Sequence, residues 1–222
     1  MQPITRIPDK KNSYAFQFVK HVVDQIKTDK PLVIGITGAG GAGKTTFGNN
    51  IVRYFGKDQC VSIDLDDYLM SRTERGKLGL TGYHPRANNL YLARENIENL
   101  VQGKTILKPV YDHSTGKTLD SEEIKPKELI ILEGVTTLYD QLRKINDLSF
   151  FLDALEETQI KSRIERDVHI RGYSVEEALI LFESLKPLYQ AFIEPTKKYA
   201  SAVFEVDTEY VMHPTHIDEK LR

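Results

Sequence analysis

Eight consecutive residues near the N-terminus have the pattern of a phosphate-binding loop. The run from Gly38 to Thr45, GAGGAGKT, fits G-x-x-x-x-G-K-(S/T) in full. Glycines let such a loop wind tightly and turn its backbone N–H groups toward a polyphosphate. Lys44 brings a cation to the outer phosphates, and Thr45 offers its hydroxyl to Mg²⁺. We therefore expect ATP and Mg²⁺ as cofactors, held by Gly38, Gly40, Gly41, Ala42, Gly43, Lys44, Thr45 and Thr46.

Carboxylates follow two further apolar runs of the sequence. Asp64, Asp66 and Asp67 lie at the end of one run, and Glu133 directly follows another. Phosphoryl transfer to an alcohol needs an acceptor for the hydroxyl proton and carboxylates close to the metal. We expect Asp66 to be the base, Asp67 to contact the metal or its ligands, and Glu133 to lie beside Mg²⁺ or its waters. Asp64 is the weaker candidate for the base, and the alternative for the whole group is a solvated acidic turn.

A basic segment, RIERDVHIRGY, begins at Arg163. Arg163 and Arg166 are three residues apart and share one face of a helix, whereas Gly172 leaves Arg171 near the helix end. Arginine binds phosphate in a bidentate manner and stabilises the charge of a transferred phosphoryl group. We expect Arg166 to act in catalysis and Arg163 and Arg171 to contact phosphate. The alternative is a solvated helix whose arginines pair with neighbouring acids.

Two stretches between residues 71 and 127 are dense in hydrogen-bonding side chains. One contains Tyr83, His84 and Arg86, and the other contains Tyr111 and His113. Neither stretch resembles a core segment, and both lie in a glycine-rich interval. The clustering favours a pocket for a polyhydroxyl acceptor molecule, contacted by these five residues. A single histidine in such a stretch is more often structural, and neither histidine has a metal-ligand spacing with a cysteine.

The elements that must position these residues alternate between strand and helix patterns. Candidate strands are 31–37, 61–65, 129–132, 148–152 and 202–206, and candidate helices are 14–27, 44–55, 92–102, 157–169 and 174–192. Strands that are apolar on both faces and separated by helices indicate a parallel sheet covered on both sides. The sequence therefore predicts an α/β fold with one five-stranded parallel sheet, and a small hairpin near 108–118.

Composition narrows the class of protein. The chain has 222 residues, 30 Lys and Arg against 32 Asp and Glu, and one cysteine, Cys60. The balanced charge does not indicate a nucleic-acid surface, and one thiol cannot form an internal disulfide. No apolar run approaches the ~20 residues of a membrane span, and residues 1–11 lack an apolar signal core. We expect a cytoplasmic enzyme without nucleic-acid or membrane partners.

In the order of its motifs, the chain resembles the phosphoribulokinase and uridine kinase family of P-loop kinases. The resemblance covers about residues 32–206. It runs in order through GAGGAGKTTF, SIDLDDY, GYHPRANN, KPVYDHSTG, LIILEG, RIERDVHIRGYS and IEPTKKYASAVFEV. It implies a P-loop kinase fold, MgATP as phosphate donor and a primary hydroxyl of a pentose or nucleoside as acceptor. It also implies Asp66 as base and the arginines as phosphate contacts.

We expect a single domain, 1–222, with the lid implied by the resemblance and the other segments by the residue patterns. An N-terminal arm and helix occupy 1–30, a substrate lobe is inserted at 71–127, a lid spans 157–173 and a tail spans 207–222. The sequence departs from the uridine kinase branch at Tyr83 and Gly116, and from the phosphoribulokinase branch at Leu69.

These departures leave the acceptor open. It is either uridine or cytidine, or a sugar resembling ribulose 5-phosphate. A homo-oligomer is compatible with the sequence. The alternative function is a nucleotide-binding regulatory P-loop protein that has lost its acceptor site.

Overall fold

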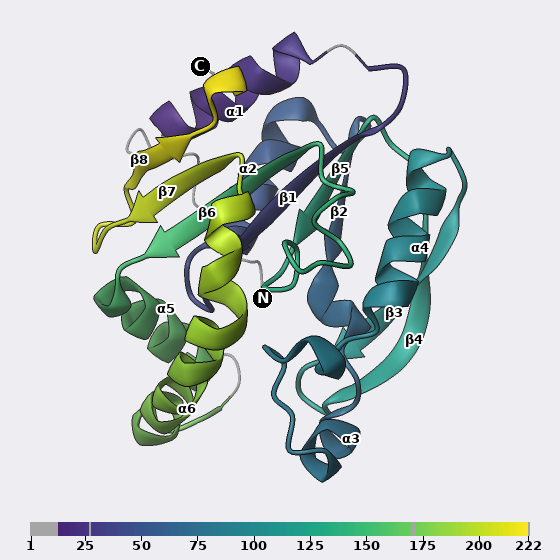
Figure 1. Cartoon of the computed structure of the whole chain (residues 1–222). Helices are drawn as coiled ribbons and strands as arrows, with labels where there is room; N and C mark the ends of the chain where they lie inside the picture. Colours follow the sequence, from purple (N-terminus) through teal and green to yellow (C-terminus); the bar gives the residue numbers. More distant parts are fainter. Residues whose placement is uncertain (1–12, 27, 170–171, 222) are drawn as a thin grey trace.

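Within residues 13–26, 28–169 and 172–221, which the computed structural model describes, six strands form a central sheet (Figure 1). In spatial order they are β2 (Cys60–Asp64), β5 (Leu129–Glu133), β1 (Leu32–Gly38), β6 (Leu148–Ala154), β7 (Ala202–Val206) and β8 (Met212–Ile217). The first five run parallel, and β8 pairs antiparallel with β7. The predicted parallel strands are confirmed. The tail was expected to be a separate segment, but it supplies a sixth, edge strand.

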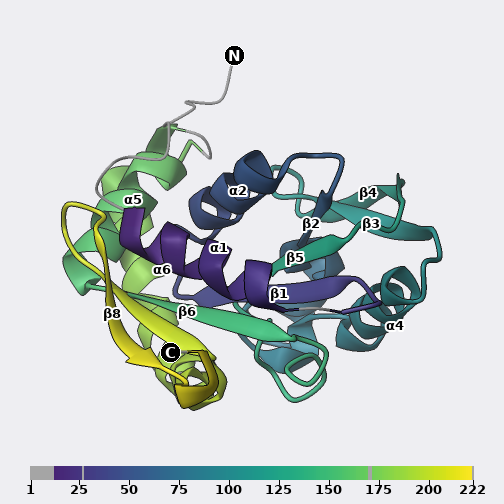
Figure 2. The same cartoon turned by 90° about the horizontal axis from the view of Figure 1, so that it is seen from above.

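Helices cover both faces of this sheet. The α-helices of the described residues are α1 (Ser13–Gln25), α2 (Lys44–Phe55), α3 (Arg72–Lys77), α4 (Leu90–Val101), α5 (Glu156–His169) and α6 (Val175–Leu188). Of these, α1 and α2 pack on one face of the sheet and α4 packs on the other, whereas α3 buries no residue. Seen from above, α1 and α2 lie together on one side of the sheet and α4 lies toward the β2 end (Figure 2). The expected N-terminal helix is present, with Val19 and Val22 buried, whereas residues 1–12 of the arm lie outside the described residues.

The apolar side chains of the parallel strands contribute to two hydrophobic cores, one on each face of the sheet. Ile34 and Ile36 of β1 pack into the cluster with α1 and α2, whereas Val33, directly before Ile34, packs into the cluster with α4. Successive side chains of a strand point to opposite faces, so a strand covered on both sides must be apolar throughout. This requirement explains why β1 and β5 read as continuous apolar runs.

The inserted interval folds as short helices and a hairpin. After β2 come the 3-10 turn η2 (Leu65–Tyr68), α3, the turn η3 (Pro85–Ala87) and α4. The hairpin strands are β3 (Ile106–Asp112) and β4 (Lys117–Ile124), which pair only with each other. The predicted hairpin is present and longer than expected.

A change of helix type ends α6. Pro187 lies inside α6, and the chain continues as a π-helical turn, η4 (Tyr189–Ile193), and a 3-10 segment, η5 (Glu194–Tyr199). Proline lacks the N–H that continues an α-helix, which accounts for the change of pitch. A last short turn, η6 (Glu219–Leu221), follows β8. None of the helices among the described residues is both long and apolar enough to cross a membrane.

Candidate active site

The glycine-rich loop joins β1 to α2 at the carboxyl edge of the parallel strands. Gly38 has a φ of +138°, and a Cβ there would lie 2.2 Å from the Leu152 carbonyl oxygen, so glycine is required. Gly43 adopts the left-handed conformation directly before the first residue of α2. The strand–loop–helix context predicted from the motif is therefore present. The positive end of α2 points toward the loop, as expected for an anion site.

Lys44 lies against its own loop. Its Nζ donates to the carbonyl oxygens of Gly38, at 3.2 Å, and Ala39, at 2.9 Å. Burial lowers the pKa of Lys44, while the charges of Asp66, Glu133 and Asp64 act to raise it and that of Arg166 to lower it further. These four groups are therefore near enough to Lys44 to interact with its charge.

The carboxylates converge because adjacent parallel strands end together. Asp64 ends β2 and is paired in register with Glu133, which ends β5. Asp66 follows in η2, where its backbone N–H donates to the Asp64 carboxylate at 2.9 Å. Burial, and after it the negative charge of the neighbouring Asp66, raises the pKa of Asp64 to about 8. Asp64 is thus more deeply involved in the cluster than its ranking from the sequence suggested.

The donor set fits a magnesium ion bound together with phosphates. Glu133 is 7% exposed, and its Oε2 is buried with no hydrogen-bond partner among the described residues. Burial raises the pKa of Glu133, and the Thr45 hydroxyl and the Lys44 charge act in the opposite direction. No group of three His, Cys, Asp or Glu side chains within the described ranges forms a metal cage. A magnesium ion would therefore need nucleotide oxygens as well as Thr45, as Mg²⁺ sites on nucleotides generally do.

The contacts of Asp67 do not support the metal role expected for it, because both of its carboxylate oxygens have partners in the hairpin. One oxygen forms an ion pair with the buried Lys108 of β3, and the other accepts the backbone N–H of Tyr111 at 2.9 Å. Both partners belong to the hairpin, so Asp67 ties the inserted lobe to η2. Asp67 and Lys108 are 41 positions apart, so no local sequence pattern predicts their contact.

Replacing Asp67 should therefore affect stability more than metal use. In Asp67→Asn the Lys108 ammonium stays buried without its close counter-charge, and breaking such pairs costs about 3–5 kcal/mol. Because Glu122 remains 3.7 Å from Lys108, we expect a loss of about 2–4 kcal/mol in the free energy of unfolding, measured by urea denaturation. Asp140→Asn is the matched control, since Asp140 pairs with Arg143 at the surface. A raised Mg²⁺ requirement with unchanged stability would restore the metal role.

The arginines of α5 lie beside the loop in different environments. Arg163 is 6% exposed, and its Cζ lies over the Phe182 ring at 5.7 Å from the ring centroid. A Cβ on Gly40 would lie 3.3 Å from Arg163 Cζ. Arg166 is more exposed, and its Nε donates to Asp167 at 2.9 Å. Arg171 lies outside the described residues.

Two of the five predicted acceptor residues lie near Asp66. His113 Nε2 is 3.7 Å from the Asp66 carboxylate, and the Tyr111 and His113 rings pack edge to face. Tyr111 is 6% exposed, and its hydroxyl accepts from Arg75 at 2.7 Å. Sequence reasoning missed Arg75, although Ser71 and Glu74 form a capping box that marks the start of its helix.

The other three predicted acceptor residues lie apart from that group. The Nδ1 of His84 accepts the Arg86 N–H and caps η3, while the ring packs on Phe192 at 4.8 Å between centroids. This placement gives His84 a structural role in place of the expected acceptor contact. The Arg86 side chain is exposed. Tyr83 lies over the phosphate loop, with its hydroxyl 2.9 Å from the Gly40 nitrogen.

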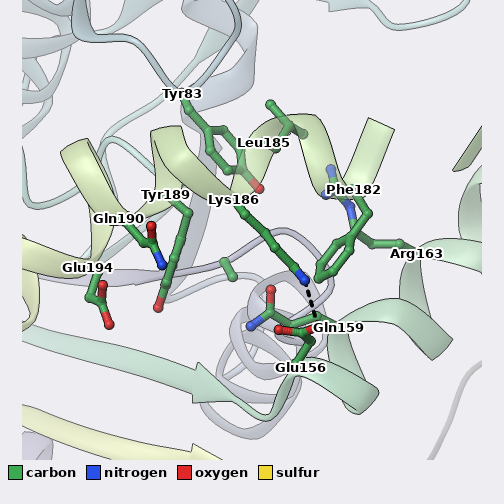
Figure 3. Close-up of a pocket in the computed structure, with 11 residues that line it drawn as sticks. Tyr83, Glu156, Gln159, Arg163, Phe182, Leu185, Lys186, Tyr189, Gln190 and Glu194 are labelled. Carbon is green, nitrogen blue, oxygen red and sulfur yellow. Dashed lines mark hydrogen bonds and ion pairs between the residues drawn. The ribbon is translucent and has the colours of Figure 1, made fainter. Parts of the chain in front are cut away.

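A pocket of about 140 Å³, open to solvent, borders the loop at Ala39. Figure 3 shows the aromatic side chains of Tyr83, Phe182 and Tyr189 around it, and the ion pair between Lys186 and Glu156. Its walls come from α5, α6 and the π-helical turn on one side and Tyr83 on the other.

Comparisons with known proteins find relatives in sequence and in fold. A sequence model of the phosphoribulokinase/uridine kinase family matches residues 33–211. A phosphoribulokinase of Synechocystis sp. is 38% identical over 180 residues, which cover 80% of this chain and 54% of that protein. A uridine kinase of Ligilactobacillus salivarius is 36% identical over 186 residues, covering 80% and 86% respectively.

Among solved structures, a putative fructose transport system kinase from Silicibacter sp. superposes with a TM-score of 0.69 at 15% identity. That match covers 80% of this chain and 94% of the other, and it bears on the fold alone. The chain spans about half the length of the curated phosphoribulokinases it matches.

Proposed function

Because the chain belongs to the phosphoribulokinase and uridine kinase family, we propose that it transfers the γ-phosphate of MgATP to a primary hydroxyl of a small sugar-like acceptor. The observation that carries the proposal is the convergence of Lys44, Asp64, Asp66 and Glu133 at one edge of the sheet. A cation on the phosphate loop, carboxylates for a metal and a proton acceptor are the groups that phosphoryl transfer to an alcohol requires. A protein that only bound a nucleotide would have no need of Asp66.

Each residue has a separate task in this reaction. Asp66 takes the proton of the acceptor hydroxyl as its oxygen forms the new bond to the γ-phosphorus, and the bond to the β-phosphate oxygen breaks to release ADP. Lys44 and Arg166 stabilise the negative charge that spreads over the transferred group. Thr45 and Glu133, with Asp64, would hold Mg²⁺, which neutralises phosphate charge when bound.

We propose that the acceptor is an anionic sugar, such as a sugar phosphate. The Tyr111 ring is too deeply buried to stack on a nucleobase, and its hydroxyl is already bonded to Arg75. The Nε of Arg75 is buried without a hydrogen-bond partner among the described residues. A guanidinium with an unused donor on the lobe that carries His113 and Tyr111 favours an acceptor that bears negative charge.

A panel of acceptors tests the function directly. The purified chain is given MgATP with uridine, cytidine, ribose, ribulose 5-phosphate or pantothenate, and ADP release is followed. We expect the phosphorylated sugar to give the highest rate. Release of ADP at one rate whether or not an acceptor is present would contradict a kinase and favour the regulatory alternative.

Substitution of Arg75 should raise the KM for the acceptor and leave the KM for ATP unchanged. We expect Arg75→Met to raise the acceptor KM by ~10- to 100-fold, since charge-assisted hydrogen bonds contribute ~1.5–3 kcal/mol. Initial rates with varied acceptor and varied ATP measure the two constants. Arg86→Ala tests the arginine expected from the sequence, and Arg94→Met, on the exposed face of α4, is the control. Unchanged acceptor KM in both Arg75→Met and Arg86→Ala would indicate an uncharged acceptor.

A further inference from the structure

A tyrosine from the inserted lobe is bonded to the phosphate loop. The Tyr83 hydroxyl accepts the backbone N–H of Gly40 at 2.9 Å, across 43 positions of sequence. A Cβ at Gly40 would lie only 2.7 Å from that hydroxyl oxygen, so the close approach depends on glycine. The N–H groups of this loop type are the donors that cradle the phosphates of a nucleotide. The Tyr83 oxygen therefore lies where a phosphate oxygen would accept the same hydrogen bond.

A second tyrosine, Tyr139, holds the backbone of Tyr83 in this position. The Tyr83 backbone carbonyl accepts the hydroxyl of Tyr139 at 2.5 Å, and Tyr139 is only 5% exposed. Tyr139 lies in the segment that follows β5 and Glu133. The contact with Gly40 is thus supported by the same part of the sheet edge that carries the carboxylates.

A second side chain near Gly40 is suited to an anion. Arg163 Nη2, like its Cζ, lies 3.3 Å from the position of a Gly40 Cβ. The Nε of Arg163 is buried and has no hydrogen-bond partner among the described residues. A phosphate oxygen above Gly40 would therefore meet both the loop N–H and a guanidinium with an unused donor.

We propose that Tyr83 is a positioning residue whose hydroxyl competes with a nucleotide phosphate for the Gly40 N–H. The hydroxyl keeps the loop donor satisfied, and nucleotide binding transfers that hydrogen bond from tyrosine to phosphate. Tyr83 also forms part of the pocket wall between α5, α6 and the loop. Its release on nucleotide binding therefore changes the pocket beside the loop. This inference rests on the proposed use of a nucleotide.

The test is equilibrium binding to the full chain by calorimetry, with MgADP and with inorganic tripolyphosphate. Tyr83→Phe keeps the ring and removes the competing oxygen. A neutral hydrogen bond contributes ~0.5–1.5 kcal/mol, so we expect both ligands to bind about 2- to 10-fold more tightly to the variant. Tripolyphosphate has no base or ribose, so a gain there places the effect at the phosphates. The ligand-free variant should unfold at the same or a slightly lower temperature.

Tyr91→Phe is the matched control, because Tyr91 is 77% exposed on α4. It should bind both ligands as the wild type does. Equal or weaker binding by Tyr83→Phe, while the wild type binds MgADP, would overturn the competition and leave the kinase proposal standing. A wild type that binds neither ligand would overturn both. A purely structural role predicts weaker binding, opposite in sign to the competition.

Discussion

Lys44→Ala should reduce kcat/KM by ~100-fold or more while the protein remains folded. Loss of a charge that contacts the transferred phosphoryl group commonly costs ~3 kcal/mol or more in the transition state. The Nζ donates only to the carbonyl oxygens of Gly38 and Ala39 among the described contacts, and burial already disfavours its charge. Removing it should therefore change the free energy of unfolding by no more than ~1–2 kcal/mol.

Steady-state kinetics and urea denaturation measure the two effects on the same preparation. Lys57→Ala is the control, since Lys57 is exposed beyond the end of α2. Near wild-type turnover in Lys44→Ala would remove the phosphate-loop interpretation. Loss of activity with loss of folding would instead assign Lys44 a structural role.

Asp66→Asn should lower kcat by ~10²- to 10⁴-fold and leave the affinity for MgATP nearly unchanged. The carboxylate takes a proton only as the acceptor hydroxyl attacks, and general-base contributions fall in this range. Its partly exposed carboxylate lies 3.7 Å from His113 Nε2 and, within the part of the chain that the structure describes, accepts no hydrogen bond on which the fold depends. Single-turnover kinetics give the chemical step, and calorimetry with MgADP gives nucleotide affinity.

The Asp64→Asn variant distinguishes the role of Asp64 from that of Asp66, the proposed base. Asp64 lies in register with Glu133, so its loss should raise the Mg²⁺ concentration needed for half-maximal rate. If Asp64→Asn at saturating Mg²⁺ lowers kcat more than Asp66→Asn does, the two roles are exchanged. Asp120→Asn, on the exposed strand β4, should behave as the wild type.

Local sequence patterns predicted the elements that depend on local physics. Runs apolar on both faces gave all five parallel strands, because a sheet covered on both sides admits few polar residues. The loop motif and Glu133 were placed correctly at the sheet edge, since parallel strands bring their carboxyl ends together. The strand β8 could not be predicted, because it lies at the sheet edge and only Met212 in it is buried.

The parts that sequence could not predict depend on distant contacts. Asp66 and Asp67 are adjacent in one acidic turn, so the sequence does not distinguish their environments. The conformation of η2 brings Asp67 to Lys108 and Asp66 close enough to Lys44 for their charges to interact. Likewise Tyr83 was expected at the acceptor and is bonded to Gly40. His84 resembled a substrate contact, yet its ring nitrogen is used as a helix cap.

Phosphorus-31 NMR of the complete reaction tests the central claim most directly. Wild-type chain, MgATP and the best acceptor of the panel are incubated together, with Asp66→Asn in parallel. The account predicts one new phosphomonoester resonance that grows in proportion to ADP, and its near absence with Asp66→Asn. Inorganic phosphate appearing in place of a phosphomonoester, or no consumption of ATP with any sugar-like acceptor, would contradict it.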